Sequence, residues 1–302
     1  MLRISRFLVP ILLTCSAALG QSRTECSALK SQILQRPIRY CVVLPQSYDA
    51  VLREHPTQRY PVLYFLHGLG NNEQTLFNSG GWNVIQDLRQ QNKIGDFLLV
   101  APEGRRSFFI NSADGKTRYS DFFLKEFMPY IERKYPIRAE RTARGISGIS
   151  MGGYGALRFA FAHPELFGSV SAESAALIPA SPQQLNAAIH AGTPLGNLLG
   201  PVFGAPVNQA HWNANDPLVL ARKNGVRLHS LAIYFNCGDN DDLGFERGAA
   251  ALHRELQAEG IAHEYHLYLG DHSLEYFLAH LGQVMEFHWK AFLRGTAPEG
   301  KH

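Results

Sequence analysis

A serine flanked by glycines stands near the middle of the chain and could act as a nucleophile. Gly148-Ile149-Ser150-Met151-Gly152 matches the pattern G-x-S-x-G. Glycines two residues before and two residues after a serine permit a very tight turn between a strand and a helix, from which the hydroxyl projects. A short apolar run precedes the pattern and an alanine-rich segment follows it. This context favours a nucleophilic Ser150 over a spectator serine in a glycine-rich turn.

A histidine near the end of the chain is the candidate base for Ser150. Asp271-His272-Ser273 follows the last predicted strand and opens the last predicted helix. The chain has 13 histidines, but His272 is the one that stands last in the order serine, acid, histidine and also lies at a strand end. We therefore expect His272 to remove the proton of Ser150.

The acid that would orient His272 is expected between these two residues. Gly238-Asp239-Asn240-Asp241-Asp242 follows an apolar strand. An acid in this loop can bond the far ring nitrogen of His272, fix its tautomer and stabilise the imidazolium. Three aspartates compete, and we predict Asp241. Asp239 and Asp242 would then be solvated loop carboxylates or turn formers.

A second turn with glycines ends an earlier strand. In His67-Gly68-Leu69-Gly70 the glycines let the backbone come close to a ligand. We expect the backbone N–H groups of Leu69 and Met151 to form an oxyanion hole for a tetrahedral intermediate. The alternative is a simple turn in which His67 is a structural hydrogen-bond partner.

Short apolar strands alternate with helical segments along most of the chain. This alternation predicts a mostly parallel sheet with helices on both faces, and active residues in loops at the carboxyl ends of the strands. The predicted strands are 60–67, 96–101, 145–148, 167–171, 228–237 and 264–269, and the predicted helices are 122–135, 152–162, 245–259 and 274–293.

One region interrupts the alternation. Residues 175–225 are rich in Pro, Gly, Asn and Ala and have only weak helical periodicity. We expect a loop-rich insertion over the sheet. It is either a cap that shapes the substrate pocket or a passive surface excursion.

The first twenty residues have the layout of a secretory signal peptide. Arg3 and Arg6 form a short basic start, residues 7–13 are apolar, and small residues lead to Gly20. This predicts a signal peptide over 1–20, cleaved after Gly20, and export to the periplasm or the cell exterior. The alternatives are a buried N-terminal helix and a lipoprotein start at Cys15.

Export would favour a disulfide bond in the N-terminal region. In an oxidising compartment Cys26 and Cys41 can pair across a hairpin. Its segments 31–34 and 38–44 flank a predicted turn around residues 35–37.

The remaining composition narrows the class of protein. The chain has 302 residues, of which 45% are hydrophobic and 18% charged, as in an ordinary globular protein. We expect a single domain over 21–302 with a disordered tail from Thr296. The formal charge of +3 comes without runs of like charge, so no nucleic-acid footprint is predicted. The apolar run of residues 7–13 is too short to span a bilayer, and no other apolar stretch is long enough for a membrane anchor. Cys237 ends an apolar run, which favours a buried strand thiol, and the cysteines lack the spacing of a zinc site.

The motifs together resemble a known family. The run from Gly148 to Arg158, with the segments 64–69 and 270–273, is similar to the putative-esterase branch of the α/β-hydrolases. This branch includes S-formylglutathione hydrolases, tributyrin and feruloyl esterases, and mycolyltransferases. The similarity extends from about Ile33 to Leu293 and is weakest over 175–225.

The resemblance implies a role for each candidate residue and an α/β-hydrolase fold. The implied roles are Ser150 as nucleophile, His272 as base, Asp241 as acid, the N–H groups of Leu69 and Met151 as oxyanion donors, and Trp82 as a residue at the mouth of the active site. The alternative for Trp82 is a purely packing role.

The implied activity is that of an exported serine carboxylesterase acting on a small-molecule ester through an acyl-enzyme. No metal or cofactor is implied. The alternatives are a thioesterase of the S-formylglutathione hydrolase type, an acyltransferase of the mycolyltransferase type, and a non-catalytic binding protein on the same fold. The exported start argues against the thioesterase, because glutathione chemistry is mainly cytosolic.

Overall fold

Eight strands form one sheet in the computed structural model, which describes residues 23–178 and 181–295. The order across the sheet is β1-β2-β4-β3-β5-β6-β7-β8. Strand β2 pairs antiparallel with β1 and β4, and the other neighbours are parallel. The strands are β1 (Arg23–Ser31), β2 (Arg36–Leu44), β3 (Val62–Leu66), β4 (Leu98–Pro102), β5 (Arg144–Ile149), β6 (Ser169–Glu173), β7 (Ala232–Gly238) and β8 (Glu264–Tyr268). The predicted signal peptide and the tail from Thr296 lie outside the described residues.

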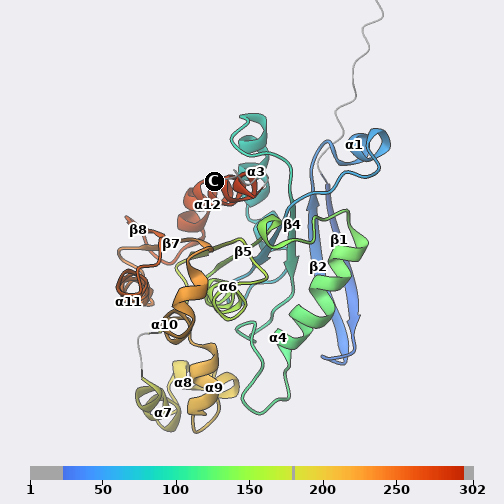
Figure 1. Ribbon diagram of the computed structural model, residues 1–302. Helices are drawn as coiled ribbons and strands as arrows, with labels where there is room; N and C mark the ends of the chain where they lie inside the picture. The colour runs from blue at the N-terminus through green and yellow to red at the C-terminus, as the bar shows by residue number, and fades with distance from the viewer. Residues whose placement is uncertain (1–22, 179–180, 296–302) are drawn as a thin grey trace, which may run out of the picture.

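Helices cover both faces of this sheet (Figure 1). On one face α6, α11 and the segment that runs through α4 and α5 contribute to the larger apolar core. On the other face α3 and α12 pack together, and α12 contacts β5, β6 and β7. The bounds are α1 (Tyr48–Glu54), α2 (Thr75–Asn78), α3 (Gly81–Gln90), α4 (Tyr119–Phe122), α5 (Met128–Lys134), α6 (Met151–Ala162), α11 (Phe245–Ala258), α12 (Leu274–Arg294) and a 3₁₀ turn η2 (Arg141–Ala143). The predicted mostly parallel α/β sheet is confirmed.

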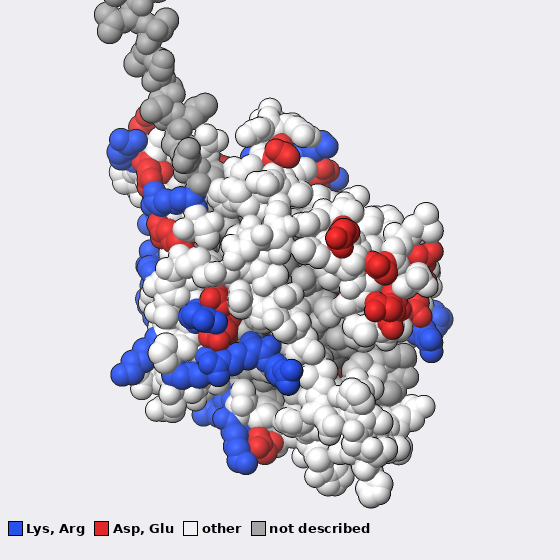
Figure 2. All heavy atoms as spheres, turned by 180° about the vertical axis from the view of Figure 1, so that it is seen from behind, with Lys and Arg blue, Asp and Glu red and all other residues white. Residues whose placement is uncertain are grey.

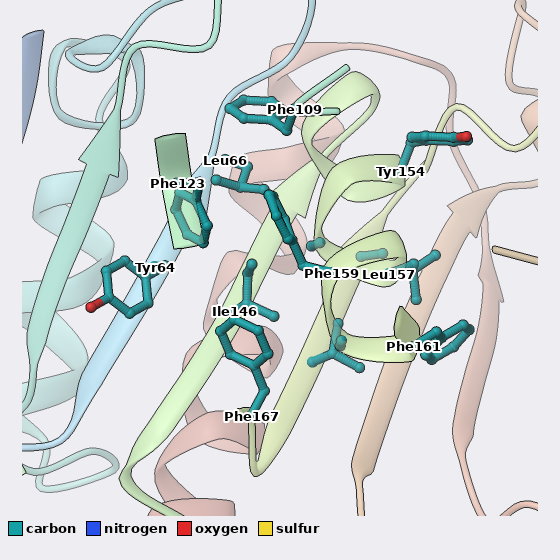
Figure 3. Packing of buried hydrophobic residues seen from close by; sticks show 14 of the residues in the cluster. Tyr64, Leu66, Phe109, Phe123, Ile146, Tyr154, Leu157, Phe159, Phe161 and Phe167 are labelled. Atoms are coloured by element: carbon teal, nitrogen blue, oxygen red, sulfur yellow. The ribbon is translucent and has the colours of Figure 1, made fainter. Parts of the chain in front are cut away.

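The central strands are apolar because neither of their faces meets water. Every residue of β3, β4 and β6 is buried, as is typical of parallel strands covered on both sides. Helix α6 fills the middle of the larger core, where Phe159 lies at a ring distance of 4.6 Å from Phe123 (Figure 3). The strands β3, β5 and β6 therefore form a buried platform below the candidate site.

The predicted helix 122–135 is present but contains a π-helical turn. The turn η1 (Phe123–Phe127) connects α4 to α5. Both Phe123 and Phe127 are fully buried in the larger core. Periodicity in the sequence indicates a helix here but does not reveal the wider turn.

The N-terminal hairpin forms, but the position predicted for its turn is wrong. Residues 32–35 form the turn rather than 35–37, so most of the predicted segment 31–34 belongs to the turn and not to a strand. The carboxylate of Glu126 accepts hydrogen bonds of 3.0 Å from two backbone amides of this turn. These amides therefore need no strand partner. Because Glu126 is distant from the turn in sequence, no local pattern reveals this contact.

The corrected turn places the two cysteines opposite each other. Cys26 and Cys41 are register partners in the β1–β2 pair and form a disulfide bond with an S–S distance of 2.02 Å. Cys237 is a free, fully buried thiol on β7, as predicted. Burial raises the pKa of its thiol to about 12, so the thiolate needed for reactivity is suppressed.

The prediction that residues 175–225 are loop-rich is wrong, because this region is mainly helical. Each helix begins after a residue whose side chain accepts a hydrogen bond from a backbone N–H in the first turn. Three of these caps are followed directly by proline at the first helical position, a common helix start. The helices are α7 (Pro182–His190), α8 (Pro194–Phe203), α9 (Gln209–Asn215) and α10 (Pro217–Leu228).

These helices are fixed to α6. The Tyr154 hydroxyl donates a hydrogen bond of 2.8 Å to the Asn215 carbonyl, and the Arg158 guanidinium donates one of 2.9 Å to the Asn215 side chain. Figure 1 shows α7, α8 and α9 gathered at one end of the molecule, beyond α10. A role of this insertion in shaping a substrate pocket stays a prediction.

The predicted strand 228–237 begins too early. Helix α10 continues to Leu228, and β7 starts at Ala232. Leu228 is fully buried. Its apolar character therefore reflects the buried face of a helix, which a short apolar run does not distinguish from a strand.

Charged residues gather in separate parts of the surface. On the face in Figure 2, Lys and Arg form a band on one side, with Asp and Glu among them. A smaller group of mainly Asp and Glu lies on the opposite side, and uncharged surface separates the two. Within residues 23–178 and 181–295, no helix is long and apolar enough to cross a membrane.

Candidate active site

The turn around Ser150 depends on its glycines. Ser150 connects β5 to α6 and has φ 53° and ψ −118°, a strained conformation for a residue other than glycine. A Cβ atom at Gly148 would lie 2.3 Å from the Gly152 backbone, and one at Gly152 would lie 1.9 Å from the Leu66 carbonyl oxygen. Both spacings exclude a side chain, so the G-x-S-x-G pattern is a steric requirement of this turn.

The structure brings Ser150, His272 and Asp241 together from three different loops. His272 Nε2 lies 3.0 Å from Ser150 Oγ, and His272 Nδ1 lies 2.8 Å from Asp241 Oδ2. Ser150 is 9% exposed and the Asp241 carboxylate is buried. With Asp241 ionised, Nδ1 carries the ring proton and Nε2 is free to accept the proton of Ser150.

Burial distinguishes the three aspartates after β7. Asp241 is buried and bonds His272, whereas Asp239 and Asp242 are exposed. Asp239 Oδ1 accepts a hydrogen bond of 3.1 Å from the Gly270 amide, so Asp239 connects the two loops without reaching the histidine. The structure thus places Asp241 in the predicted position of the acid.

The surroundings of Asp241 favour its ionised form. Burial alone would raise its pKa, but the hydrogen bond and charge of His272 and the backbone amides of Leu243 and Phe245 outweigh burial. They hold the pKa of Asp241 below its ordinary value. The acid therefore keeps its charge in the pH range where an imidazole titrates.

Two aromatic rings that sequence reasoning missed hold the His272 ring. Phe245 and Phe277 each meet the imidazole edge to face, with ring centroids 5.3 Å away. Phe245 starts α11 and Phe277 lies in the first turn of α12. Both are close in sequence to predicted site residues, but aromatic residues at these positions also fit ordinary core packing.

The two predicted oxyanion donors flank Ser150. Met151 is the first residue of α6, whose N-terminus favours negative charge. Leu69 follows Gly68, where a Cβ atom would lie 3.6 Å from the Cβ atom of Ser150. Both backbone segments are therefore near the position that an ester carbonyl would occupy. Their role as oxyanion donors stays a prediction.

His67 has a structural role in the same loop. Its Nε2 accepts a hydrogen bond of 2.8 Å from the Gly104 amide, and its Nδ1 lies 2.7 Å from the Gly68 carbonyl oxygen. Burial lowers the pKa of His67, so the ring is neutral, with its proton on Nδ1. This pair of bonds holds the turn before Leu69 in place.

Trp82 lies on α3 and is half-buried against the apolar cluster between the sheet and α12. This location agrees with the packing alternative, and a substrate contact stays a prediction.

Across residues 23–178 and 181–295, no group of three or more His, Cys, Asp or Glu side chains could hold a metal ion.

Comparison with known proteins agrees with this geometry. The family model described as Putative esterase matches residues 31–288. The chain belongs to this family. A solved ferulic acid esterase superposes with a TM-score of 0.75 at 26% identity, covering 90% of this chain and 99% of the other. The eight-stranded sheet and the turn at Ser150 are those of the α/β-hydrolase fold.

Two curated relatives resemble the chain at a similar level. Esterase Rv1288 of Mycobacterium tuberculosis is 28% identical over 249 residues, which are 76% of this chain and 51% of the relative. The chain therefore spans about half the length of that protein. An acetyl esterase of Caldicellulosiruptor saccharolyticus is 26% identical over 270 residues, 85% of this chain and 94% of the relative.

Proposed function

We propose that this protein is a serine carboxylesterase in which Ser150, His272 and Asp241 form the catalytic triad. The observation that carries the proposal is the unbroken pair of hydrogen bonds, 3.0 Å from Ser150 to His272 and 2.8 Å from His272 to Asp241. The strained turn at Ser150 and the membership of the Putative esterase family support it.

The proposed reaction has two acyl-transfer steps. His272 removes the proton of Ser150 Oγ as the oxygen attacks the ester carbonyl, and the C–O bond to the alcohol then breaks. His272 returns the proton to the leaving alcohol. A water molecule next attacks the acyl-enzyme with the same base, releasing the acid and restoring Ser150.

The backbone N–H groups of Leu69 and Met151 would stabilise the negative oxygen in both steps. Removing one such donor typically costs about 10²- to 10³-fold in rate. Neither donor is a side chain, so substitution at these positions does not remove it. Distortion of the turn offers a better test: a Cβ atom at Gly152 would lie 1.9 Å from the Leu66 carbonyl oxygen, so Gly152→Ala must shift the backbone next to Met151.

Export is part of the proposal. It rests on the signal-like residues 1–20, and the Cys26–Cys41 disulfide of the hairpin supports it because such bonds persist in oxidising compartments. The test is to express the full chain and sequence the N-terminus of the exported product. A start at Gln21 is expected, and retention of the full chain inside the cell contradicts export.

The deciding experiment uses chain 21–302 with a series of p-nitrophenyl esters from acetate to decanoate. We expect turnover that Ser150→Ala abolishes and a preference for short acyl chains, in keeping with the acetyl esterase relative. A fluorophosphonate probe, followed by peptide mass spectrometry, should label Ser150. Absence of both turnover and labelling contradicts the proposal.

A transferase of the same mechanism differs in the group that accepts the acyl chain. The same assay with added glycerol or trehalose measures this difference as the ratio of transfer product to free acid. We expect free acid to dominate. Dominant transfer product would keep the triad but replace hydrolysis by acyl transfer.

A further inference from the structure

A second carboxyl group lies next to the candidate site and has no assigned role. Glu173 is the last residue of β6 and is 0% exposed. Neither of its carboxyl oxygens has a hydrogen-bond partner among the described residues. Asn236, its register partner on β7, accepts a hydrogen bond from Tyr276 on its amide oxygen and donates one amide hydrogen to Tyr234. Its second amide hydrogen is the group that favours ionisation of Glu173. An unpaired buried carboxyl group is costly to keep and is a candidate for function.

Burial sets the protonation state of this group. It raises the pKa of Glu173 to about 8, although the side chain of Asn236 acts in the opposite direction. The group is therefore a neutral carboxylic acid near pH 7, with one O–H donor and acceptor oxygens. It can both donate a hydrogen bond to a small polar group and accept one from it.

Glu173 lies in the wall of a small cavity that is otherwise largely apolar. The cavity has a volume of about 20 Å³, enough for one or two heavy atoms. Besides Glu173, its wall includes His67, Ile149 and Phe277, and most of the other side chains that line it are apolar.

The cavity adjoins the triad on the side of the sheet covered by α12. Ile149 directly precedes Ser150, and the Phe277 ring packs against His272. His67 precedes Gly68, which faces Ser150. A small group attached to the carbonyl carbon of a substrate at Ser150 would have this cavity beside it.

We propose that Glu173 determines acyl specificity, by hydrogen bonding the hydroxyl of a two-carbon hydroxyacyl group whose carbonyl is attacked by Ser150. This proposal rests on the proposed esterase function and names its substrate class as esters of short hydroxy acids. The cavity volume limits the acyl chain, and the Glu173 carboxyl supplies the polar partner that an alkyl chain leaves unsatisfied.

The chemistry predicts discrimination between acyl groups of equal size. Hydroxyacetyl and propionyl differ only by a hydroxyl in place of a methyl group. A site built to bond a hydroxyl rejects the analogue that lacks it, whereas an apolar pocket discriminates weakly against an added hydroxyl. A hydrogen bond at Glu173 should therefore favour hydroxyacetyl by about 10- to 100-fold.

The test compares kcat/KM for phenyl hydroxyacetate and phenyl propionate, each divided by its rate of alkaline hydrolysis to remove electronic differences. The wild type is expected to favour hydroxyacetate by about 10- to 100-fold. Glu173→Leu should reduce the ratio to about 1 or invert it, while Glu173→Gln keeps most of it. Ser171→Ala, on the same strand and face, is the matched control and should leave the ratio unchanged.

The outcomes separate this proposal from the proposed function. A wild-type ratio near 1, or the same ratio in Glu173→Leu, overturns the role of Glu173 and leaves the esterase intact. If Glu173→Leu lowers kcat/KM equally for both esters, Glu173 has a structural role, and the proposed role in acyl specificity is overturned. Failure of fluorophosphonate labelling at Ser150 overturns the esterase function and this proposal with it. If Glu173→Leu does not fold, the ratios of the wild type and Glu173→Gln decide.

Discussion

Within residues 23–178 and 181–295, His272 and His288 each lie within hydrogen-bond distance of a serine hydroxyl, but their surroundings differ. At the carboxyl ends of the parallel strands, His272 Nε2 is 3.0 Å from Ser150 Oγ. Between α12 and the sheet, His288 Nε2 is 2.8 Å from Ser171 Oγ, and its Nδ1 is 2.8 Å from Ser169 Oγ. The distances alone do not distinguish a nucleophile from a structural serine.

The two histidines differ in the hydrogen-bond partner of Nδ1 and in their exposure to solvent. His272 has the carboxylate of Asp241 on Nδ1, which stabilises the positive charge that forms when the ring takes a proton. His288 has only a hydroxyl there and is fully buried, and burial lowers its pKa to about 3. It remains neutral and serves as a hydrogen-bonding bridge between β6 and α12.

The largest effect expected from this comparison is the loss of one hydroxyl. Ser150→Ala should lower kcat by about 10⁴- to 10⁶-fold, because the nucleophile is removed. Ser171→Ala removes the corresponding hydroxyl of the buried pair and should change kcat by less than about threefold. Steady-state kinetics on p-nitrophenyl acetate, with thermal melts to confirm folding, measure both. Similar losses in the two variants would mean that the pairs are not functionally distinct.

The next effect concerns the acid. Asp241→Asn should lower kcat by about 10⁴-fold, because an amide stabilises the wrong tautomer of His272 and not its charged form. Asp239→Asn is the control, since its carboxylate is exposed and bonds only the Gly270 amide. It should retain near wild-type activity. A reversal of these two results would assign the acid to Asp239.

Sequence patterns predict the meeting of Ser150, Asp241 and His272 better than they predict the elements around these residues. The turn at Ser150 leaves a local steric signature, because side chains at Gly148 and Gly152 would collide with backbone atoms. Strand order then predicts which loops meet at the carboxyl edge of the sheet, and this locates Asp241 and His272. These inferences need only neighbours in sequence or the general topology of a parallel sheet.

Other features depended on contacts that no local pattern reveals. The turn of the N-terminal hairpin is fixed by Glu126, which is about ninety residues away in sequence. The carboxyl group of Glu173 is buried without a hydrogen-bond partner only in the folded chain, where β7 and α12 surround it. The helices of the insertion are different, because caps such as Ser181 and Asp216 followed by proline were present in the sequence. The Pro-, Gly-, Asn- and Ala-rich composition of this region favours loops, whereas its capping pattern favours helices, and the capping pattern is the more reliable signal here.

The buried pair should also reveal itself in the pH dependence of stability. The pKa of His288 is about 3 when folded, against about 6.5 when unfolded. Above pH 6.5 the ring is neutral in both states and its contribution is fully present. As the pH falls below 6.5 the unfolded chain takes up a proton that the folded protein does not.

This difference should reduce the free energy of unfolding by up to about 1.4 kcal/mol per pH unit between pH 6.5 and pH 3. Urea unfolding at pH 7, 6 and 5 measures the slope. His288→Gln keeps hydrogen-bonding groups and removes the titration, so its slope should be smaller. Equal slopes in the two proteins would mean that the buried imidazole does not resist protonation.

The smallest effect tests how the His272 ring is held. Phe245 meets the His272 ring edge to face at 5.3 Å and does not line the cavity at Glu173. Such aromatic contacts contribute about 0.5–1.5 kcal/mol, so Phe245→Leu should lower kcat by about 2- to 10-fold with little change in KM. The ratio of hydroxyacetyl to propionyl turnover should be unaffected, since the acyl side is intact. If this ratio changes while kcat does not, Phe245 acts on substrate binding rather than on the orientation of His272. Histidine position would then depend on Asp241 and Phe277 alone, and the difference between the two serine–histidine pairs would reduce to the acid and solvent access.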